Sequence, residues 1–434
     1  MVSVVVIGTG YVGLVTGVCL ADMGHQVHCV DIDTNKIAQL NRGELPIYEV
    51  GLEELMGRNR ALGRLTFGTQ LADGLAQADC VFLAVNTPAS PSGEACLDYI
   101  MGAVETLRTC LSKGQAPLLR TVVIKSTVPV GTGARIQALL DPLGVQVVAN
   151  PEFLREGNAV QDALHPERIV IGSTHPEAQS VMTHLYQAYT RRGIPLVMTS
   201  VKTAELIKYA ANAFLATKIS FINECAVLCD AVGANVLDVA HAMGLDTRIG
   251  PHFLAPGPGF GGSCFPKDIQ ALHHTGAQHG VTMHMIEAVT RINQRQRKWV
   301  VDCVARLAPS PATIAILGLA FKAGTDDMRD APSLFIVPAL SKMGYTLRGY
   351  DPIAGSHAQA PLGQWMTLCH TIDGALEGAD MAVILTEWDE FSSYPMAHFS
   401  CLTKRIILDT RHMIDPVHAQ SHGIRVVGLG TCTE

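Results

Sequence analysis

The chain has 434 residues, of which 48% are hydrophobic and only 16% are charged, against about 25% charged in ordinary domains. Its net charge of −7 argues against a protein that coats nucleic acid, and no highly charged or low-complexity stretch indicates disorder. At roughly 100–200 residues per domain, the length predicts several domains with cores of their own.

The first 21 residues contain no charged side chain, and three interpretations compete for them. A signal peptide is disfavoured because no basic residue precedes Val2. A membrane helix has support in the G-x-x-x-G spacing of Gly13 and Gly17, although no other apolar run nears the roughly 18 residues of a span. A buried strand followed by a helix explains more of the pattern, and we adopt it.

A dinucleotide-binding unit follows from that interpretation. Residues 2–7 form a β-branched run typical of a strand buried on both faces. Gly8, Gly10 and Gly13 then make G-x-G-x-x-G, residues 14–23 are predicted as a helix, and the strand 26–30 ends in Asp31. Such glycines let the backbone approach a pyrophosphate at the helix N-terminus, and the acid binds ribose hydroxyls. Because Asp31 would repel a 2′-phosphate, we expect NAD rather than NADP.

A second copy of this pattern lies near the C-terminus. Residues 313–317 lead into Gly318, a strand beginning at residue 344 ends at Asp351, and residues 73–85 are echoed at 373–385. Between the copies, residues 203–233, 236–243 and 283–307 show helical periodicity. We therefore predict an α/β protein with two Rossmann-like, doubly wound parallel sheets. The expected divisions are an NAD-binding domain at 1–200, a helical region at 201–308 and a second Rossmann-like domain at 309–434.

The twelve cysteines form no C-x-x-C pair and mostly stand in apolar runs. Cys225 and Cys229 are one helical turn apart with no further ligand in sight, so we expect them to pack rather than to bind metal. We predict no metal site and, in the absence of a signal peptide, a reduced protein of the cytoplasm.

One cysteine is different. Residues 257–268 form a glycine-rich approach to a predicted helix start, with Ser263 as its cap and Pro266 in its first turn. A thiol there, beside Lys267, is expected to have a lowered pKa. The four glycines favour a close backbone approach to a ligand over a plain tight turn. In a dehydrogenase, such a Cys264 thiolate suggests capture of an aldehyde as a thiohemiacetal, oxidation to a thioester and hydrolysis to the acid.

Four segments carry a family resemblance. Residues 150–157, 205–214, 261–268 and 320–329 resemble, in order and over nearly the whole chain, the UDP-glucose/GDP-mannose dehydrogenase family. The resemblance implies a four-electron oxidation in which a nucleotide sugar, two NAD⁺ and water yield a nucleotide-uronate and two NADH.

The resemblance also implies roles for individual residues. Cys264 is similar to the nucleophile, Lys208 and Asn212 to a pair that stabilises the oxyanion, Asp268 and Thr127 to groups that position a water, and Glu152 to a residue that assists thioester hydrolysis. The implied NAD contacts are Gly8, Gly10, Tyr11, Val12, Gly13, Asp31, Lys36, Thr87, Thr127, Glu156, Lys267 and Arg329. The implied substrate contacts are Glu152, Phe153, Leu154, Arg155, Lys208, Asn212, Arg248, Phe260, Gly261, Phe265, Lys322 and Arg411.

The identity of the sugar nucleotide depends on two further segments. Residues 246–250 resemble the branch that oxidises UDP-glucose, in which the arginine reaches the sugar nucleotide of a neighbouring subunit, and this implies a homodimer or higher oligomer built on the helical region. Arg411 is similar to a residue that holds the uridine nucleotide. Oxidation of GDP-mannose or a UDP-N-acetylhexosamine stays open, as does an NAD- and UDP-sugar-binding regulatory module without catalysis. One departure from the family is Val50, where a proline is usual before Gly51.

Overall fold

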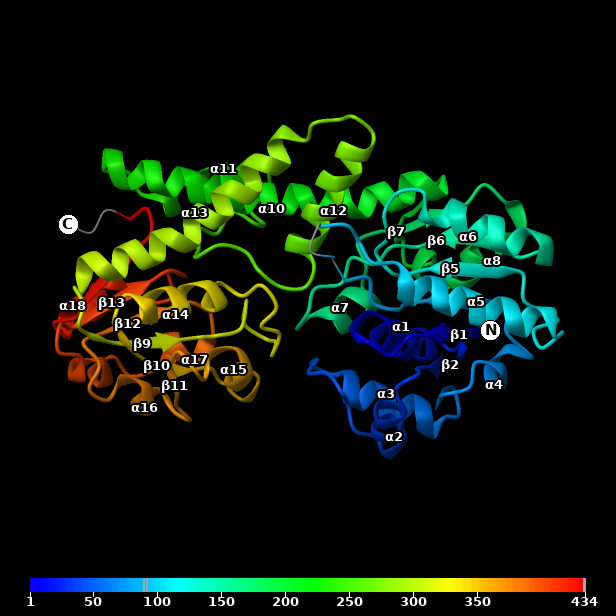
Figure 1. The fold of residues 1–434 in the computed structure, drawn as a ribbon, viewed down its shortest axis with the longest axis horizontal. Coiled ribbons are helices and arrows are strands. Elements are labelled where there is room, and N and C mark those ends of the chain that lie inside the picture. The colour runs from blue at the N-terminus through cyan, green and yellow to red at the C-terminus, as the bar shows by residue number, and fades with distance from the viewer. Residues whose placement is uncertain (89, 91–92, 432–434) are drawn as a thin grey trace. The chain divides into compact units, whose positions relative to one another are not determined.

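The computed structural model describes residues 1–88, 90 and 93–431 (Figure 1). The chain forms two compact units. The first contains Met1–Ala211 with Gln270–His279, and the second contains Asn212–Ile269 with Gly280–Glu434. Two helices, α10 (Val201–Val232) and α12 (Phe265–Gln278), run across these boundaries and therefore contribute residues to both units.

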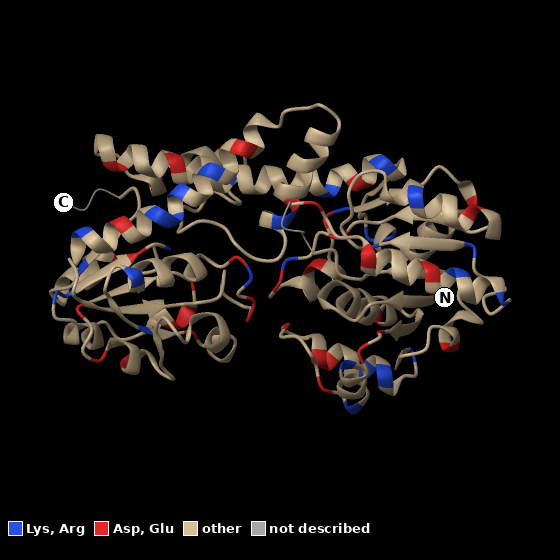
Figure 2. Cartoon of the chain, viewed as in Figure 1, with Lys and Arg blue, Asp and Glu red and all other residues tan. Residues whose placement is uncertain are grey.

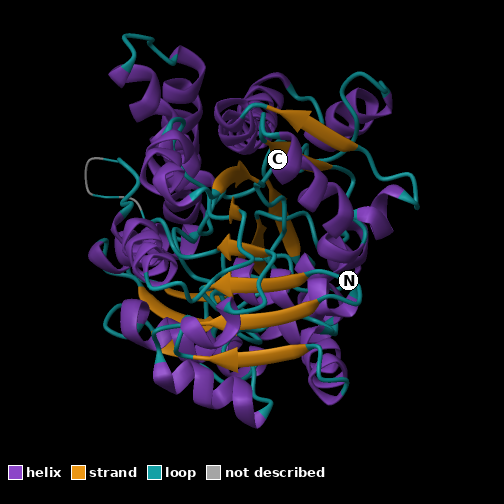
Figure 3. Ribbon diagram, turned by 90° about the vertical axis from the view of Figure 1, so that its right-hand side faces the viewer, coloured by secondary structure: helices purple, strands orange, loops and turns teal. Residues whose placement is uncertain are grey.

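The first unit is built on an eight-stranded sheet. Strand order is β3-β2-β1-β4-β5-β6-β7-β8, and all neighbours are parallel except β6 and β7. The first six strands have the order of a dinucleotide-binding fold. Figure 3 shows these arrows side by side with helices against the sheet. The strands are β1 (Ser3–Ile7), β2 (Gln26–Val30), β3 (Leu65–Gly68), β4 (Cys80–Leu83), β5 (Thr121–Ile124), β6 (Gln146–Ala149), β7 (Ile169–Gly172) and β8 (Leu196–Thr199).

Burial on both faces of this sheet explains the uncharged start of the chain. Val4 and Val6 of β1 pack in one apolar cluster with Leu14 of the first helix. Val5, pointing the opposite way, packs with Ile100 in a second cluster. None of the eight strands contains a charged residue, and the charges of this unit lie on helices and loops (Figure 2). Among the described residues, no helix is long and apolar enough to cross a membrane.

The helices of the first unit connect its strands. They are α1 (Tyr11–Asp22), α2 (Thr34–Arg42), α3 (Leu52–Ala61), α4 (Ala72–Leu75), α5 (Asp98–Ser112), α6 (Thr132–Leu140), α7 (Ala159–Leu164), α8 (Pro176–Leu185) and α9 (Gln187–Thr190). The first helix begins at Tyr11, three residues earlier than its periodicity indicated. Gly13 is thus in the first helical turn, whereas Gly8 and Gly10 precede the helix.

The second unit repeats this architecture. Its strand order is β11-β10-β9-β12-β13-β14, and every neighbouring pair is parallel. The predicted pair of doubly wound sheets is therefore confirmed. The strands are β9 (Thr313–Leu317), β10 (Thr346–Tyr350), β11 (Thr367–Leu368), β12 (Met381–Ile384), β13 (Ile406–Asp409) and β14 (Arg425–Gly428); the helices are α14 (Pro332–Lys342), α15 (Gly355–Leu362), α16 (Ile372–Leu376), α17 (Asp389–Ser393) and α18 (Pro416–Ser421).

The two copies agree in hydrogen bonding as well as in strand order. The amide of Gly8 donates to the last residue of β2 at 2.8 Å, and that of Gly318 donates to the last residue of β10 at 2.8 Å. Both glycines have positive φ, +100° and +90°. The two copies differ in the surroundings of the acid that follows the second strand. In the second copy this acid, Asp351, is enclosed by its own chain and only 5% exposed.

Four helices lie between the two sheets in the sequence: α10 (Val201–Val232), α11 (Val236–Leu245), α12 (Phe265–Gln278) and α13 (His284–Leu307). The helices predicted at 203–233, 236–243 and 283–307 are confirmed. Cys225 and Cys229 pack in an apolar cluster with Ile222. No group of three potential metal ligands occurs in the part of the chain that the structure describes; Cys432 lies outside it. The three-domain division stays a prediction.

Asp351 offers a test of the second sheet. Its Oδ2 accepts from the amides of Leu319 and Ala320 and from the Trp388 indole, and its Oδ1 accepts from the amides of Ile353 and Ala354, all at 2.7–3.1 Å.

Replacing Asp351 with Asn puts an NH₂ group opposite some of these donors. We expect D351N to lower the free energy of unfolding by about 2 kcal/mol or more, measured by urea denaturation. D389N, at an exposed acid of α17, is the matched control. Equal stability of the two variants would contradict this account.

Candidate active site

The glycine motif forms a close-packed cradle at the carboxyl end of β1. A Cβ on Gly13 would stand 1.9 Å from the carbonyl oxygen of Gly8, and a Cβ on Gly8 would stand 2.7 Å from that of Ala84. Gly10 precedes α1, and no side chain caps this helix. Its first N–H groups are therefore available to a phosphate, so the residues fit the pyrophosphate of a dinucleotide.

Asp31 stands at the end of the neighbouring strand, β2. Its Oδ2 accepts from the amide and hydroxyl of Thr9, both at 2.8 Å, and lies 3.4 Å from the ammonium of Lys36. Burial by itself raises the pKa of Asp31, but the hydrogen bonds from Thr9 and Asp33 and the charge of Lys36 hold it below its usual value. The carboxylate is thus ionised, as recognition of ribose hydroxyls and rejection of a 2′-phosphate require.

Three other implied NAD residues lie at the same sheet edge. Thr87 follows β4, and its hydroxyl donates to the Thr127 carbonyl at 2.7 Å. Val12 lies in the first turn of α1. The carboxyl ends of β1, β4 and β5 thus bring these separate segments together, as the strand order requires.

A buried ion pair forms the centre of those residues in the first unit that are predicted to be catalytic. The Lys208 ammonium of α10 lies 2.8 Å from Oε1 of Glu152, and the two side chains are 4% and 5% exposed. The other carboxylate oxygen accepts from the Leu154 amide at 2.6 Å. Burial raises the pKa of Glu152, but Lys208 next to it outweighs this and the pKa is lowered. A small cavity beside the pair is lined in part by Thr127, Pro151 and Lys208.

Lys125 is a second lysine of this centre, which the sequence patterns did not single out. It follows β5 directly, and its ammonium donates to Oδ1 of Asn150 at 3.2 Å. Burial of the ammonium lowers the pKa of Lys125 to about 8; Glu152 opposes this shift and Lys208 adds to it. A lysine directly after the apolar, β-branched run at residues 121–124 is the sequence signal that could have pointed to it.

In the second unit, the predicted nucleophile lies at the start of α12. The helix begins at Phe265, so Cys264 rather than Ser263 occupies the position before the first turn. The Cys264 carbonyl accepts from the Asp268 amide at 2.8 Å, and the Ser263 hydroxyl lies 3.5 Å from the thiol sulfur. The thiol is partly exposed and in no disulfide.

Asp268 is the centre of a polar cluster one turn further along α12. Its side chain is 1% exposed, its Oδ1 lies 2.6 Å from the Lys267 ammonium, and its Oδ2 accepts from the Asn212 amide at 2.6 Å. Lys267, an implied NAD residue, is thus paired with Asp268. Asn212 lies on α10 four residues after Lys208, so the two predicted oxyanion donors are one turn apart on one helix.

Two of the glycines before Cys264 lie close against other parts of the protein, while their predicted approach to a ligand stays a prediction. A Cβ on Gly261 would stand 2.3 Å from the Asp330 carbonyl, and one on Gly262 would stand 2.8 Å from the ring of Phe321. At both positions the close approach is therefore to the protein itself. Packing of this chain against itself requires these glycines.

Buried amides hold this glycine-rich segment. Asn293 of α13 accepts from the Phe260 amide at 2.8 Å and donates to its carbonyl at 3.0 Å. Gln296 and Asn223 bind the carbonyl and the amide of Gly257, each at 2.8 Å. Sequence reasoning missed these residues, although amides on the apolar side of a predicted helix were a usable signal.

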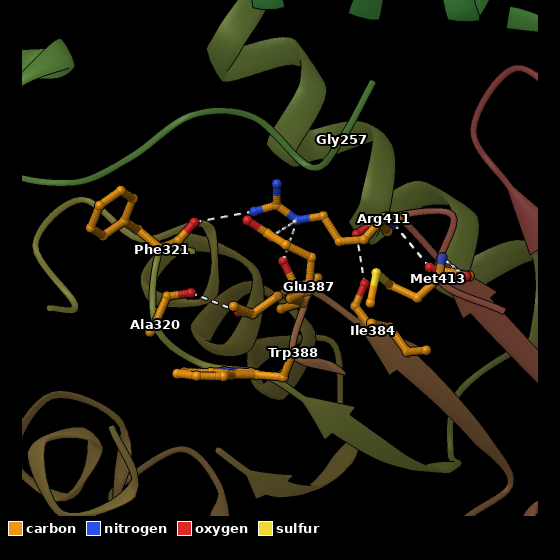
Figure 4. A network of polar contacts seen from close by, with 12 residues as sticks. Gly257, Ala320, Phe321, Ile384, Glu387, Trp388, Arg411 and Met413 are labelled. Carbon is orange, nitrogen blue, oxygen red and sulfur yellow. Dashed lines mark hydrogen bonds and ion pairs between the residues drawn. The ribbon is translucent and has the colours of Figure 1, made fainter. Parts of the chain in front are cut away.

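Arg411 lies at the carboxyl end of the second sheet (Figure 4). Its Nε donates to the Leu385 carbonyl at 2.8 Å and lies 3.1 Å from the Glu387 carboxylate, and its Nη2 donates to the Phe321 carbonyl at 3.1 Å. The loops after β9, β12 and β13 thus fix a guanidinium where the strand order reverses, the place at which open α/β sheets bind ligands.

The other residues that are predicted to contact ligands interact with nearby side chains. Arg155, Arg248 and Arg329 are exposed arginines, and each is paired with an acid of its own segment. The Phe153 ring lies under the Arg168 guanidinium, 4.0 Å away. The Lys322 ammonium lies 5.7 Å from the Phe321 ring, and the rings of Phe260 and Phe265 are 6.0 Å apart. Their roles toward ligands stay predictions.

Taken together, the fold and these residues describe a dinucleotide-dependent oxidoreductase with a second nucleotide-type domain. Three domain models of the UDP-glucose/GDP-mannose dehydrogenase family match this chain. The model of the NAD binding domain matches residues 2–190, that of the central domain residues 202–295 and that of the UDP binding domain residues 315–416. The chain therefore belongs to this family, as its motifs predicted, and its cofactor is NAD.

Individual relatives agree with this placement. The chain is 43% identical to the UDP-glucose 6-dehydrogenase YwqF of Bacillus subtilis, over 99% of this chain and 97% of the relative. It is 43% identical to the UDP-glucose 6-dehydrogenase of Rhizobium meliloti, over 99% of each. A solved UDP-glucose dehydrogenase from Pyrobaculum islandicum superposes with a TM-score of 0.90 at 36% identity, over 98% of this chain and 97% of that one.

Lys125 has a testable pH dependence. Its pKa of about 8 in the folded protein lies below the 10.5 of a free lysine. Between these values the unfolded chain binds one proton more than the folded chain, so this lysine makes stability rise with pH. We expect the difference in free energy of unfolding, wild type minus K125M, to increase from pH 8 to pH 10, measured by urea denaturation. A flat difference, like that for K113M at an exposed lysine, would contradict the lowered pKa.

Proposed function

We propose that this protein is a UDP-glucose 6-dehydrogenase, which oxidises the C6 alcohol of UDP-glucose to the carboxylate of UDP-glucuronate. The observation that carries the proposal is the cysteine at the start of α12 with the carboxylate of Asp268 one turn away. The relatives named above support UDP-glucose as the substrate. The overall reaction consumes one water and two NAD⁺, and it releases two NADH and three protons.

Bound NAD⁺ supplies the hydride acceptor in both oxidations. Gly8, Gly10, Gly13 and Asp31 would hold it, on the evidence of the glycine cradle and the ionised carboxylate. In the first oxidation the alcohol loses a hydride and a proton and becomes an aldehyde. The Cys264 sulfur then adds to the carbonyl carbon, and the carbonyl oxygen takes up a proton, which completes a thiohemiacetal.

Lys208 and Asn212 stabilise the oxygen that becomes negative in these steps. A lysine ammonium and an amide N–H one helical turn apart can both donate to one oxyanion. In the structure the ammonium is paired with Glu152 and the amide with Asp268. Both donors are therefore already oriented by carboxylates. The substrate oxygen would replace these carboxylates as the acceptor of the two donors.

The second oxidation and the hydrolysis complete the sequence. The thiohemiacetal loses a hydride and a proton and becomes a thioester. A water, positioned by Asp268 and Thr127, attacks this carbon; the C–S bond breaks and the thiolate of Cys264 leaves. Glu152 accepts a proton in this step, which its ionised state supports.

In this proposal the second Rossmann-like domain binds the nucleotide of the substrate. We assign its recognition to Arg411, because three loops at the carboxyl end of the sheet fix this guanidinium in place. Lys322, on the loop after β9, is assigned to the same ligand. An arginine held in this way presents a planar set of donors suited to phosphate or to a base edge.

The first experiment measures stoichiometry and the role of the thiol. Wild-type protein with limiting UDP-glucose and excess NAD⁺ is expected to form two NADH per sugar, followed by absorbance. We expect C264S to stall with a bound intermediate and to lose about a thousand-fold or more in steady turnover, the scale of losing a nucleophile. C401S, at an exposed cysteine of the second unit, is the control. One NADH per sugar, or unchanged turnover in C264S, would overturn the mechanism.

The same assay with GDP-mannose and UDP-N-acetylglucosamine tests substrate choice. A preference for GDP-mannose would overturn the assignment of Arg411 to uridine. Binding of NAD⁺ and UDP-glucose without any NADH would identify a binding module instead of an enzyme.

We also propose that the enzyme works as a dimer in the cytoplasm. Phe214, Phe221 and Leu228 are spaced seven residues apart on α10 and are 64%, 49% and 61% exposed. Residues two turns apart lie on one side of a helix, so they form an apolar stripe that a second copy would cover. Arg248, 87% exposed, is assigned to the sugar nucleotide of the neighbouring subunit. Eleven described cysteines without a disulfide suit a reducing compartment.

A charged residue introduced into the apolar stripe tests the proposed dimer. We expect F221E to reduce the mass in sedimentation velocity from twice 46.4 kDa to 46.4 kDa, because a carboxylate buried between apolar surfaces is strongly disfavoured. L118E, at an exposed leucine of the first unit, should keep the wild-type mass. A monomeric wild type, or a dimeric F221E, would contradict the proposed interface.

A further inference from the structure

The loop at residues 150–158 is held by buried acids at both ends. At its beginning, Glu152 binds the Leu154 amide and Lys208. At its end, the acceptor is Glu49, a residue about a hundred positions earlier that precedes α3. The predicted ligand residues Phe153 and Arg155 lie between these two attachments.

Glu49 binds three backbone amides and one hydroxyl. Its Oε1 accepts from the Ala159 amide at 2.8 Å and from the Val160 amide at 3.4 Å, and its Oε2 accepts from the Gly157 amide at 2.8 Å. The side chain is 5% exposed. Oε2 also accepts a short hydrogen bond from the Tyr11 hydroxyl.

The Tyr11 hydroxyl connects this carboxylate to the glycine cradle. Tyr11 is the first residue of α1 and stands between Gly10 and Gly13 of the cradle. Besides donating to Glu49, its hydroxyl accepts from the Gly157 amide at 3.0 Å. Burial and the hydrogen bond to Glu49 raise the pKa of Tyr11, so the hydroxyl keeps its proton and stays a donor.

These contacts form a closed set. Tyr11, Glu49 and Gly157 are linked pairwise by hydrogen bonds that a small displacement would break, and Tyr11 is part of the chain of the cradle itself. A ligand that fixes the backbone of the cradle therefore also fixes the end of the loop. A second ligand that needs the ordered loop then pays less of the ordering entropy, which appears as positive coupling between the two ligands.

We infer that Glu49 is a positioning residue that couples dinucleotide binding at the glycine cradle to sugar-nucleotide binding at residues 152–155. The inference rests on the proposed function and on the family resemblance, which implies substrate contacts at residues 152–155. Glu49 touches neither ligand in this account; it acts through Tyr11 and the amides of Gly157 and Ala159.

The coupling is measured with a pair of ligands that cannot react. NADH cannot accept a hydride, so the dissociation constant of UDP-glucose can be determined by calorimetry with and without saturating NADH. We expect NADH to tighten UDP-glucose binding to the wild type by roughly five-fold or more, the usual scale of such coupling. In E49Q, in which an NH₂ group opposes the amide donors, we expect the factor to fall below about two.

Three further measurements separate coupling from general damage. NADH binding by itself, followed by fluorescence, should stay within about two-fold of wild type in E49Q, since the glycines and Asp31 are unchanged. Y11F leaves Glu49 in place and removes only the hydroxyl, and it should lower the coupling factor in the same direction. It also keeps the inference testable if E49Q does not fold. E53Q, at an exposed acid of α3, should keep the wild-type factor.

The outcomes are distinct. If UDP-glucose or NADH does not bind the wild type, the proposed function fails. If both bind the wild type independently, or if the coupling factor is unchanged in E49Q and Y11F, the role of Glu49 fails while the proposed function stands.

Discussion

Burial of parallel strands on both faces is the constraint on which the rest of the structure depends. Neighbouring residues of β1 point to opposite sides of the sheet and enter separate apolar clusters. A strand in this position has no solvated face, so polar chemistry is excluded from it. Charged groups are therefore gathered where strands end, and Asp31, Lys125 and Arg411 all follow a strand directly or within two residues.

Several acids of this protein are buried, and burying a carboxylate costs free energy unless hydrogen bonds replace those to water. In three cases the structure supplies several backbone N–H donors to one carboxylate. Glu205 accepts from the amides of Gly131 and Gly133 at 2.7 and 2.6 Å, while Glu49 and Asp351 bind three and four amides. Such acids connect segments that are far apart in the sequence. A neutral amide side chain in their place would leave some donors unsatisfied.

Local signals predicted much of this protein. The β-branched runs, the spacing of the glycines and the acid after the second strand were enough for both sheets, because parallel strands and phosphate-binding turns impose strict local requirements. The family motifs pointed to Cys264, Lys208 and Asp268. What local signals could not supply was the partner of each group. Nothing near Glu49 in the sequence indicates Gly157, and nothing near Asn293 indicates Phe260.

The sequence by itself thus determined the two Rossmann-like sheets, the cofactor and the family, since these depend on residues within one strand–turn–helix unit or one motif. Only the tertiary structure decided that the glycines before Cys264 pack against Asp330 and Phe321, and that a second lysine stands beside the Glu152–Lys208 pair. The reason is physical. The surroundings of a buried group are made by elements that meet only after folding, and their distances, not their order along the chain, set its hydrogen bonds and its charge state.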